Sequence, residues 1–115
     1  MDQHFPEWVR KDEATIIDGL ITAILNRGYL ISVFDGEEYS VKRSADRELI
    51  QKETAATCDT TYVVRTADGV RVGFFWMIHG NGCDVISDYS DSPTFDAIWN
   101  EIEPLTDWDL YHEGA

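Results

Sequence analysis

Two Asp-Gly pairs, each placed between short runs of strand-forming residues, constrain the fold more than any other feature of this sequence. The pairs are Asp35-Gly36 and Asp68-Gly69. An Asp-Gly pair in this setting is a strong hairpin signal, because the turn needs residues that tolerate a left-handed backbone. Since a hairpin joins neighbouring antiparallel strands, the sequence predicts an antiparallel sheet. The predicted strands cover residues 29–34, 37–42, 60–66 and 70–79.

One further strand and one shared face follow from the same reasoning. The turn Gly80-Asn81-Gly82 leads into residues 83–89, which we expect to form the third strand of a meander. On the first hairpin, strict alternation would place four apolar side chains on one face. These side chains are Ile31, Val33, Tyr39 and Val41.

Helical periodicity occurs between and around the hairpins. Ile and Leu residues in 12–27 recur at the spacing of one helix face, and Gly28 is the expected stop. A short helix is predicted over 44–55 with Ser44 as its N-cap, and a third over 93–103, which begins at a Ser-Pro pair. The order α-ββ-α-βββ-α predicts an α+β fold, with about three helices packed mainly on one face of the sheet.

The chain has 115 residues, a length that fits one domain over 1–115. An N-terminal arm over 1–11 and a tail over 105–115 are expected at its ends. Residues 74–78 are apolar on both strand faces. This pattern indicates either a central strand covered on both sides or an outer face that meets a partner chain, a second copy of this protein included.

The charge of the chain is strongly one-signed. Twenty-two acidic residues face nine basic ones, which gives a net charge of −13, and residues 73–115 contain no Lys or Arg. We expect such a chain to repel nucleic acid and anionic membranes and to attract a basic protein surface. Solubility alone is the alternative explanation. The predicted partner-binding residues are Asp84, Asp88, Asp91, Asp96, Glu101 and Glu103.

The remaining composition predicts a cytoplasmic protein. The two cysteines, Cys58 and Cys83, indicate reduced thiols in a sequence that shows no secretory signal at its start. The longest apolar run is far too short to cross a bilayer, so no membrane partner is expected.

His79 and Cys83 are the strongest candidates for chemistry. They lie four residues apart across a turn, so they could converge on a metal ion or form a base and nucleophile pair. No second pair of ligands at zinc spacing accompanies them, and a free cysteine often behaves as a small apolar residue. We therefore expect no catalytic residue, metal or cofactor, with a small enzyme or metal protein centred on these two residues as an alternative.

Four basic residues, Lys42, Arg43, Arg47 and Lys52, lie close together in the sequence. They could hold an anion. Because acidic residues are interspersed among them, we expect a patch of internal ion pairs instead.

Several short strings resemble those of short uncharacterised proteins carried by phages, plasmids and other mobile elements of proteobacteria. They are FDGEE at 34–38, KRS at 42–44 with Asp46-Arg47, and GNG at 80–82 followed by DVISDYSD at 84–91. The resemblance covers about residues 15–103. It implies a mobile-element setting, where small acidic proteins often counter host defences, and it transfers no catalytic residue.

Together these observations predict a non-enzymatic protein-binding module of a mobile genetic element. Carboxylates spread over a strand, a turn and a helix can imitate a phosphate backbone. The expected role is an acidic inhibitor, of anti-CRISPR or anti-restriction type, that acts as a DNA mimic on a host nucleic-acid-handling complex. A homodimeric structural or regulatory protein is the alternative, motivated by residues 74–78.

Overall fold

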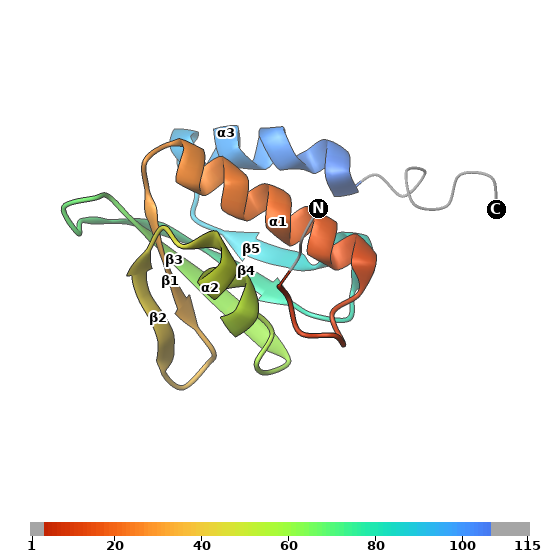
Figure 1. Cartoon of the computed structure of the whole chain (residues 1–115). Coiled ribbons are helices and arrows are strands. Elements are labelled where there is room, and N and C mark those ends of the chain that lie inside the picture. The colour runs from red at the N-terminus through yellow and green to blue at the C-terminus, as the bar shows by residue number, and fades with distance from the viewer. Residues whose placement is uncertain (1–3, 107–115) are drawn as a thin grey trace.

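A five-stranded antiparallel sheet forms the centre of the structure (Figure 1). The computed structural model describes residues 4–106. The strand order across the sheet is β2-β1-β3-β4-β5, so β2 and β5 are the two outer strands. The strands are β1 (Leu30–Phe34), β2 (Tyr39–Ser44), β3 (Asp59–Arg65), β4 (Arg71–Ile78) and β5 (Ile86–Tyr89).

Three helices cover one face of this sheet. α1 (Lys11–Asn26) and α3 (Pro93–Ile102) lie side by side over it (Figure 1), and α2 (Arg47–Glu53) contacts β1, β2 and α1. Two 3₁₀ turns, η1 (Gly82–Asp84) and η2 (Glu103–Thr106), complete the fold. The predicted α-ββ-α-βββ-α order and the α+β class are therefore confirmed, as a single compact domain.

The core lies between the apolar stripe of α1 and the helix-facing side of the sheet. Of the Ile and Leu side chains at the helical spacing, all but the partly buried Leu25 are fully buried there, against residues such as Ile31 and Val33. Burial of each such side chain stabilises the fold by about 1.5–3 kcal/mol before entropy is counted. The stripe predicted from the sequence is thus the face that joins helix to sheet.

An aromatic stack connects α3 to the last two strands. The ring of Phe75 on β4 lies 5.0 Å from that of Phe95 on α3 and 5.5 Å from that of Tyr89 on β5, measured between centroids. Tyr89 stacks in turn on Trp99 of α3, at 5.7 Å. Such pairs contribute about 0.5–1.5 kcal/mol each beyond their burial. The stack runs from the core to the surface beside β5.

The first hairpin departs from strict alternation. Ile31, Val33 and Val41 are buried as expected, but Tyr39 is 40% exposed on the opposite face. The register explains this difference, because Val33 pairs with Val41 while the next residue of β1 pairs with Tyr39, which leaves one extra residue in β2. A bulge of this kind reverses the side to which the following side chain points.

Two element boundaries also differ from the predictions. α2 begins after Asp46, whose carboxylate accepts a hydrogen bond from the N–H of Leu49, while Ser44 is the last residue of β2. Residues 83–85 do not belong to a strand, because the chain forms η1 before β5 begins at Ile86. Both differences are local. At such boundaries, hydrogen bonds from side chains to the backbone compete with those of regular helices and strands.

The ends of the chain lie partly outside residues 4–106. Of the predicted arm, Phe5 packs against the core and Trp8 is 56% exposed. Of the predicted tail, Leu105 packs against the core. Across residues 4–106, no helix is both long and apolar enough to cross a bilayer.

Gly73 on β4 provides a test of how tightly α3 packs on the sheet. A β-carbon there would lie 2.8 Å from the ring of Phe95 and 2.6 Å from the hydroxyl of Ser90. We expect Gly73→Ala to lower the free energy of unfolding by about 1–3 kcal/mol, because the ring and the strand must move apart. Urea denaturation followed by tryptophan fluorescence measures the change.

Gly19→Ala is the matched control for that variant. Its added carbon would lie 2.5 Å from the end of the Leu105 side chain, which can move aside, and in ordinary contact with Ile102 at 3.8 Å. Alanine also favours a helix over glycine by about 1 kcal/mol. We expect Gly19→Ala to be the more stable of the two variants. Equal stability of Gly73→Ala and the wild-type protein would show that α3 is not held as closely as described.

Candidate functional site

The six predicted partner-binding acids are all exposed, and we call this set the acidic edge. It comprises Asp84, Asp88, Asp91, Asp96, Glu101 and Glu103. The outer strand β5, the loop that follows it and α3 carry most of them, and η1 and η2, which contact each other, carry the rest.

Tyr89 lies at the centre of this edge. Partial burial raises the pKa of its phenol, and the negative charges of Asp96, Asp91, Glu103 and Asp88 raise it further. Four of the six acids are therefore close enough to act on one ring. Tyr89 and its stacking partner Trp99 are both half-buried, so part of an aromatic pair is exposed among the carboxylates.

The acids of this edge are mostly without a basic partner. Glu101 forms an ion pair with Arg27, at 3.1 Å. None of the other five forms an ion pair within residues 4–106. A surface with several uncompensated carboxylates around an aromatic pair can attract a cationic surface and present apolar area to it.

The opposite end of the sheet carries a basic hollow, which we call the cationic pocket. A β-bulge builds it, because Ile31 pairs with Ser44 and Val33 with Val41, so that both Lys42 and Arg43 lie opposite the single residue Ser32. The N–H of Arg43 donates to the Ser32 hydroxyl oxygen at 2.9 Å. Arg43 also has a φ of +48°, a left-handed conformation that is strained for this residue. The bulge thus brings two cations to the face that the helices leave open.

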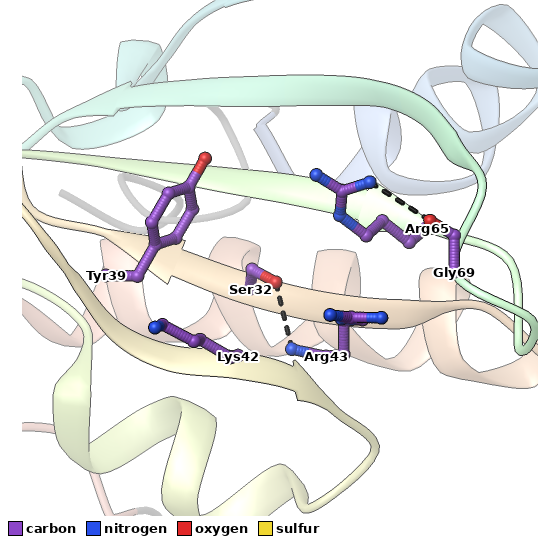
Figure 2. Close-up of a pocket in the computed structure, with 6 residues that line it drawn as sticks. All are labelled: Ser32, Tyr39, Lys42, Arg43, Arg65 and Gly69. Carbon is purple, nitrogen blue, oxygen red and sulfur yellow. Dashed lines mark hydrogen bonds between the residues drawn. The ribbon is translucent and has the colours of Figure 1, made fainter.

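Arg65 of β3 completes the cationic pocket. Its guanidinium donates to the carbonyl of Gly69 at 3.0 Å, and a β-carbon at Gly69 would lie 3.1 Å from the guanidinium of Arg43. Figure 2 shows both guanidinium groups at the Gly69 end and Lys42 pointing toward Tyr39 at the other. The hollow has a volume of about 410 Å³.

The basic residues of the chain fall into two groups. Arg47 and Lys52 form ion pairs with Asp18 and Glu48, as predicted for that cluster. Lys42 and Arg43 do not, and Arg65 and Arg71 likewise have no ion pair within the part of the chain that the structure describes. The expectation of internal ion pairs was therefore wrong for Lys42 and Arg43, because the bulge turns them away from the acids of α2.

An aromatic row crosses the same open face. It is one line of cross-strand neighbours, from β2 to β5: Tyr39, Phe34, Thr61, Trp76 and Asp88. The indole N–H of Trp76 donates to the carboxylate of Asp59 at 3.0 Å, which fixes the ring. A second hollow of about 460 Å³ lies over this row and shares Tyr39 with the cationic pocket.

The row also explains why residues 74–78 are apolar on both faces. Phe75 and Met77 are buried under the helices, whereas Phe74 and Trp76 line the hollow on the open face. No described element covers that side (Figure 1). Coverage on both sides, one of the two explanations offered by the sequence, was therefore wrong within residues 4–106.

His79 belongs to a buried polar network. Its Nε2 lies 2.8 Å from the Thr60 hydroxyl and its Nδ1 lies 3.9 Å from a carboxylate oxygen of Glu13, with both ionisable side chains only 1% exposed. Glu13 accepts hydrogen bonds from the N–H groups of Gly80 and Gly82. The order hydroxyl, imidazole, carboxylate is that of a nucleophilic triad, but Thr60 is buried and also accepts from a backbone N–H. The network therefore fixes the β4–η1 turn.

The structure also shows where Cys83, the other residue of the His79 and Cys83 hypothesis, lies. Cys83 lies half-buried in η1, and no disulfide joins it to the exposed Cys58. Within residues 4–106, no group of three His, Cys, Asp or Glu side chains is arranged to hold a metal ion. The geometry gives these two residues a place in the turn between β4 and β5.

Comparison with protein-family models, with curated proteins and with solved structures finds no match for this chain.

Protonation of His79 should lower stability. Burial lowers the pKa of His79, although the charges of Glu13 and Asp59 oppose this effect. In the unfolded chain the imidazole has a pKa of about 6.5, so below that pH the unfolded state takes up a proton that the folded state resists. We expect the urea midpoint to fall between about pH 7 and pH 5, and to fall less in His79→Gln.

His4→Gln is the control, because His4 is partly exposed and near Glu48. Its urea midpoint should fall with pH more than that of His79→Gln, because the buried imidazole of His79 is still present. An equal dependence in wild type and His79→Gln would contradict the buried neutral imidazole.

Proposed function

We propose that this protein is a binding module that docks through its acidic edge onto a basic protein surface. The observation that carries the proposal is the set of unpaired carboxylates around the half-buried Tyr89 and Trp99. Carboxylates steer a cationic partner and set its orientation, whereas exposed aromatic area supplies affinity once water is excluded.

The position of the edge favours docking as well. β5 is an outer strand with no neighbour on its far side within the described chain. Its short length and the charge of Asp88 protect it from pairing with other strands, which is a common feature of outer strands in natural sheets. A partner that approaches with Lys or Arg side chains meets Asp88 on this strand and the other carboxylates on the elements that flank it.

In its narrower form, the proposal is that the protein inhibits a host complex that handles nucleic acid. Exposed carboxylates on β5, on the following loop and on α3 would take the place of phosphates in a basic channel. The anti-CRISPR or anti-restriction setting rests on the resemblance of the sequence strings to mobile-element proteins. The docking proposal does not depend on that setting.

A double charge reversal tests the docking surface. We expect Asp91→Lys/Asp96→Lys to reduce recovery of a basic partner from host lysate by well over tenfold, because two attractive charges become repulsive. The measurement is affinity capture at physiological salt, with mass spectrometry of the bound proteins and a second wash at high salt. Restriction or CRISPR complexes among the proteins recovered would support the narrower form.

Glu37→Lys/Glu38→Lys is the matched control. It changes the net charge by the same amount, at exposed side chains of the β1–β2 turn that are remote from the acidic edge. We expect it to retain the partner. Equal loss in both double variants would mean that overall charge, not the acidic edge, governs capture, and retention by both would refute docking at this edge.

A further inference from the structure

We propose that the open face of the sheet binds a nucleotide, with the phosphate in the cationic pocket and the base on the aromatic row. This site lies on a different face from most of the docking surface proposed above, although the two share Asp88. It joins two adjacent hollows that share Tyr39 and that lie on the side of the sheet opposite the helices.

The cationic pocket is suited to a phosphate group. Lys42, Arg43 and Arg65 contribute three positive charges that no described carboxylate neutralises. Guanidinium groups present planar pairs of donors that match phosphate oxygens, and an ammonium group adds a mobile point charge. The hydroxyls of Ser32 and Tyr39 line the same hollow and can donate as well.

The backbone of the pocket indicates a built arrangement. Arg43 is held in a left-handed conformation by a bulge and by the hydrogen bond from its N–H to Ser32. Strained residues of this kind persist where the surrounding structure fixes them, and they cluster at binding sites. Without the extra residue, alternation would send Lys42 and Arg43 to opposite faces. The bulge is therefore what concentrates the charge.

The aromatic row is suited to a base. Trp76 is held by its hydrogen bond to Asp59, and Tyr39 packs on Phe34 with their ring centroids 5.0 Å apart. Aromatic rings on the open face of an antiparallel sheet can stack on a base. The cost of ordering these rings is small because the fold already holds them.

The spacing along the strands fits one nucleotide. On β3, Thr61 lies in the aromatic row, Val63 lies in the next row with Ser32, and Arg65 lies in the row beyond. Each step of two residues spans about 7 Å, so the aromatic and cationic parts are separated by about 7–14 Å. Asp88 closes the aromatic row at β5. Its negative charge repels a phosphate there, which orients the ligand with its phosphate toward Arg43 and Arg65.

Two other occupants are less favoured by the charges. A long nucleic acid would bring its phosphates past a molecule whose net charge is −13. A second copy of this chain, packed face to face, would bring together two molecules that each carry a net charge of −13. A mononucleotide needs only the local positive field.

Calorimetric titration of the full chain tests the proposal. The probes are the four common nucleoside 5′-monophosphates, with adenosine and inorganic phosphate as partial ligands. We expect saturable binding of at least one nucleotide, and at least tenfold weaker binding of adenosine and of phosphate, since each fills one hollow only. Lys42→Gln/Arg43→Gln should weaken nucleotide binding by about tenfold or more.

Lys11→Gln/Lys52→Gln is the matched control. It removes the same number of positive charges from positions on α1 and α2, away from the open face. It should bind nucleotides as the wild type does. Circular dichroism and urea denaturation establish that both double variants are folded. We expect Lys42→Gln/Arg43→Gln to fold, because the side chains of Lys42 and Arg43 form no hydrogen bond or ion pair with other described residues.

Each contrary outcome replaces the proposal. Absence of saturable binding for all four nucleotides refutes it. Phosphate binding as tight as nucleotide binding reduces the site to an anion site. Equal weakening in both double variants indicates long-range charge in place of a pocket. If a short single-stranded oligonucleotide binds far more tightly than any mononucleotide, the face is assigned to a nucleic acid. If light scattering shows self-association that Trp76→Ser abolishes, the face is assigned to a second copy of the chain.

Discussion

All three helices of the described chain pack against the same face of the sheet. The apolar stripe of α1 and the ring of Phe95 fill the space above β1, β3 and β4, and Gly73 leaves room for that ring. Because all three helices lie on the same side, the other face must be stabilised by its own side chains. Trp76, anchored on Asp59, and the Phe34–Tyr39 pair do this. The open aromatic face is thus a direct consequence of how the core is built.

Charge is segregated across the width of the sheet. The cationic pocket lies toward β2, with Arg43 at the bulge and Arg65 on β3, whereas the acidic edge lies beyond β4, along β5 and α3. Ion pairs such as Arg47 with Asp18 and Lys52 with Glu48 remove most of the basic charge from the helical side. A chain with a net charge of −13 therefore still presents a local positive site. Net charge describes long-range attraction, while the pairing of individual residues decides what can bind at short range.

The sequence predicted features whose signals are local. The hairpin turns, the stripe of α1 and the Ser-Pro start of α3 each depend on a few neighbouring residues, and the order of elements followed from them. The acids of the edge were found in the same way, because residues 84–103 form consecutive elements. The cationic pocket was not predicted, since it requires the register of β1, β2 and β3. Lys42 and Arg43 were visible as a cluster, but their partner Arg65 is more than twenty residues away, and only the bulge shows that all three share one face.

Asp88 belongs to both proposed surfaces, and this shared residue limits how independent they can be. Its carboxylate lines the hollow over Trp76 and is also one of the charges that act on Tyr89 at the acidic edge. A basic partner that neutralises Asp88 would weaken the local negative field beside the aromatic row, and so favour an anionic ligand on the open face. Linkage makes the effect reciprocal, because a ligand whose affinity rises with the partner must raise the affinity of the partner by the same factor. The two surfaces face different directions, yet the cross-strand pairing of Asp88 with Trp76 connects them through a single rigid strand pair.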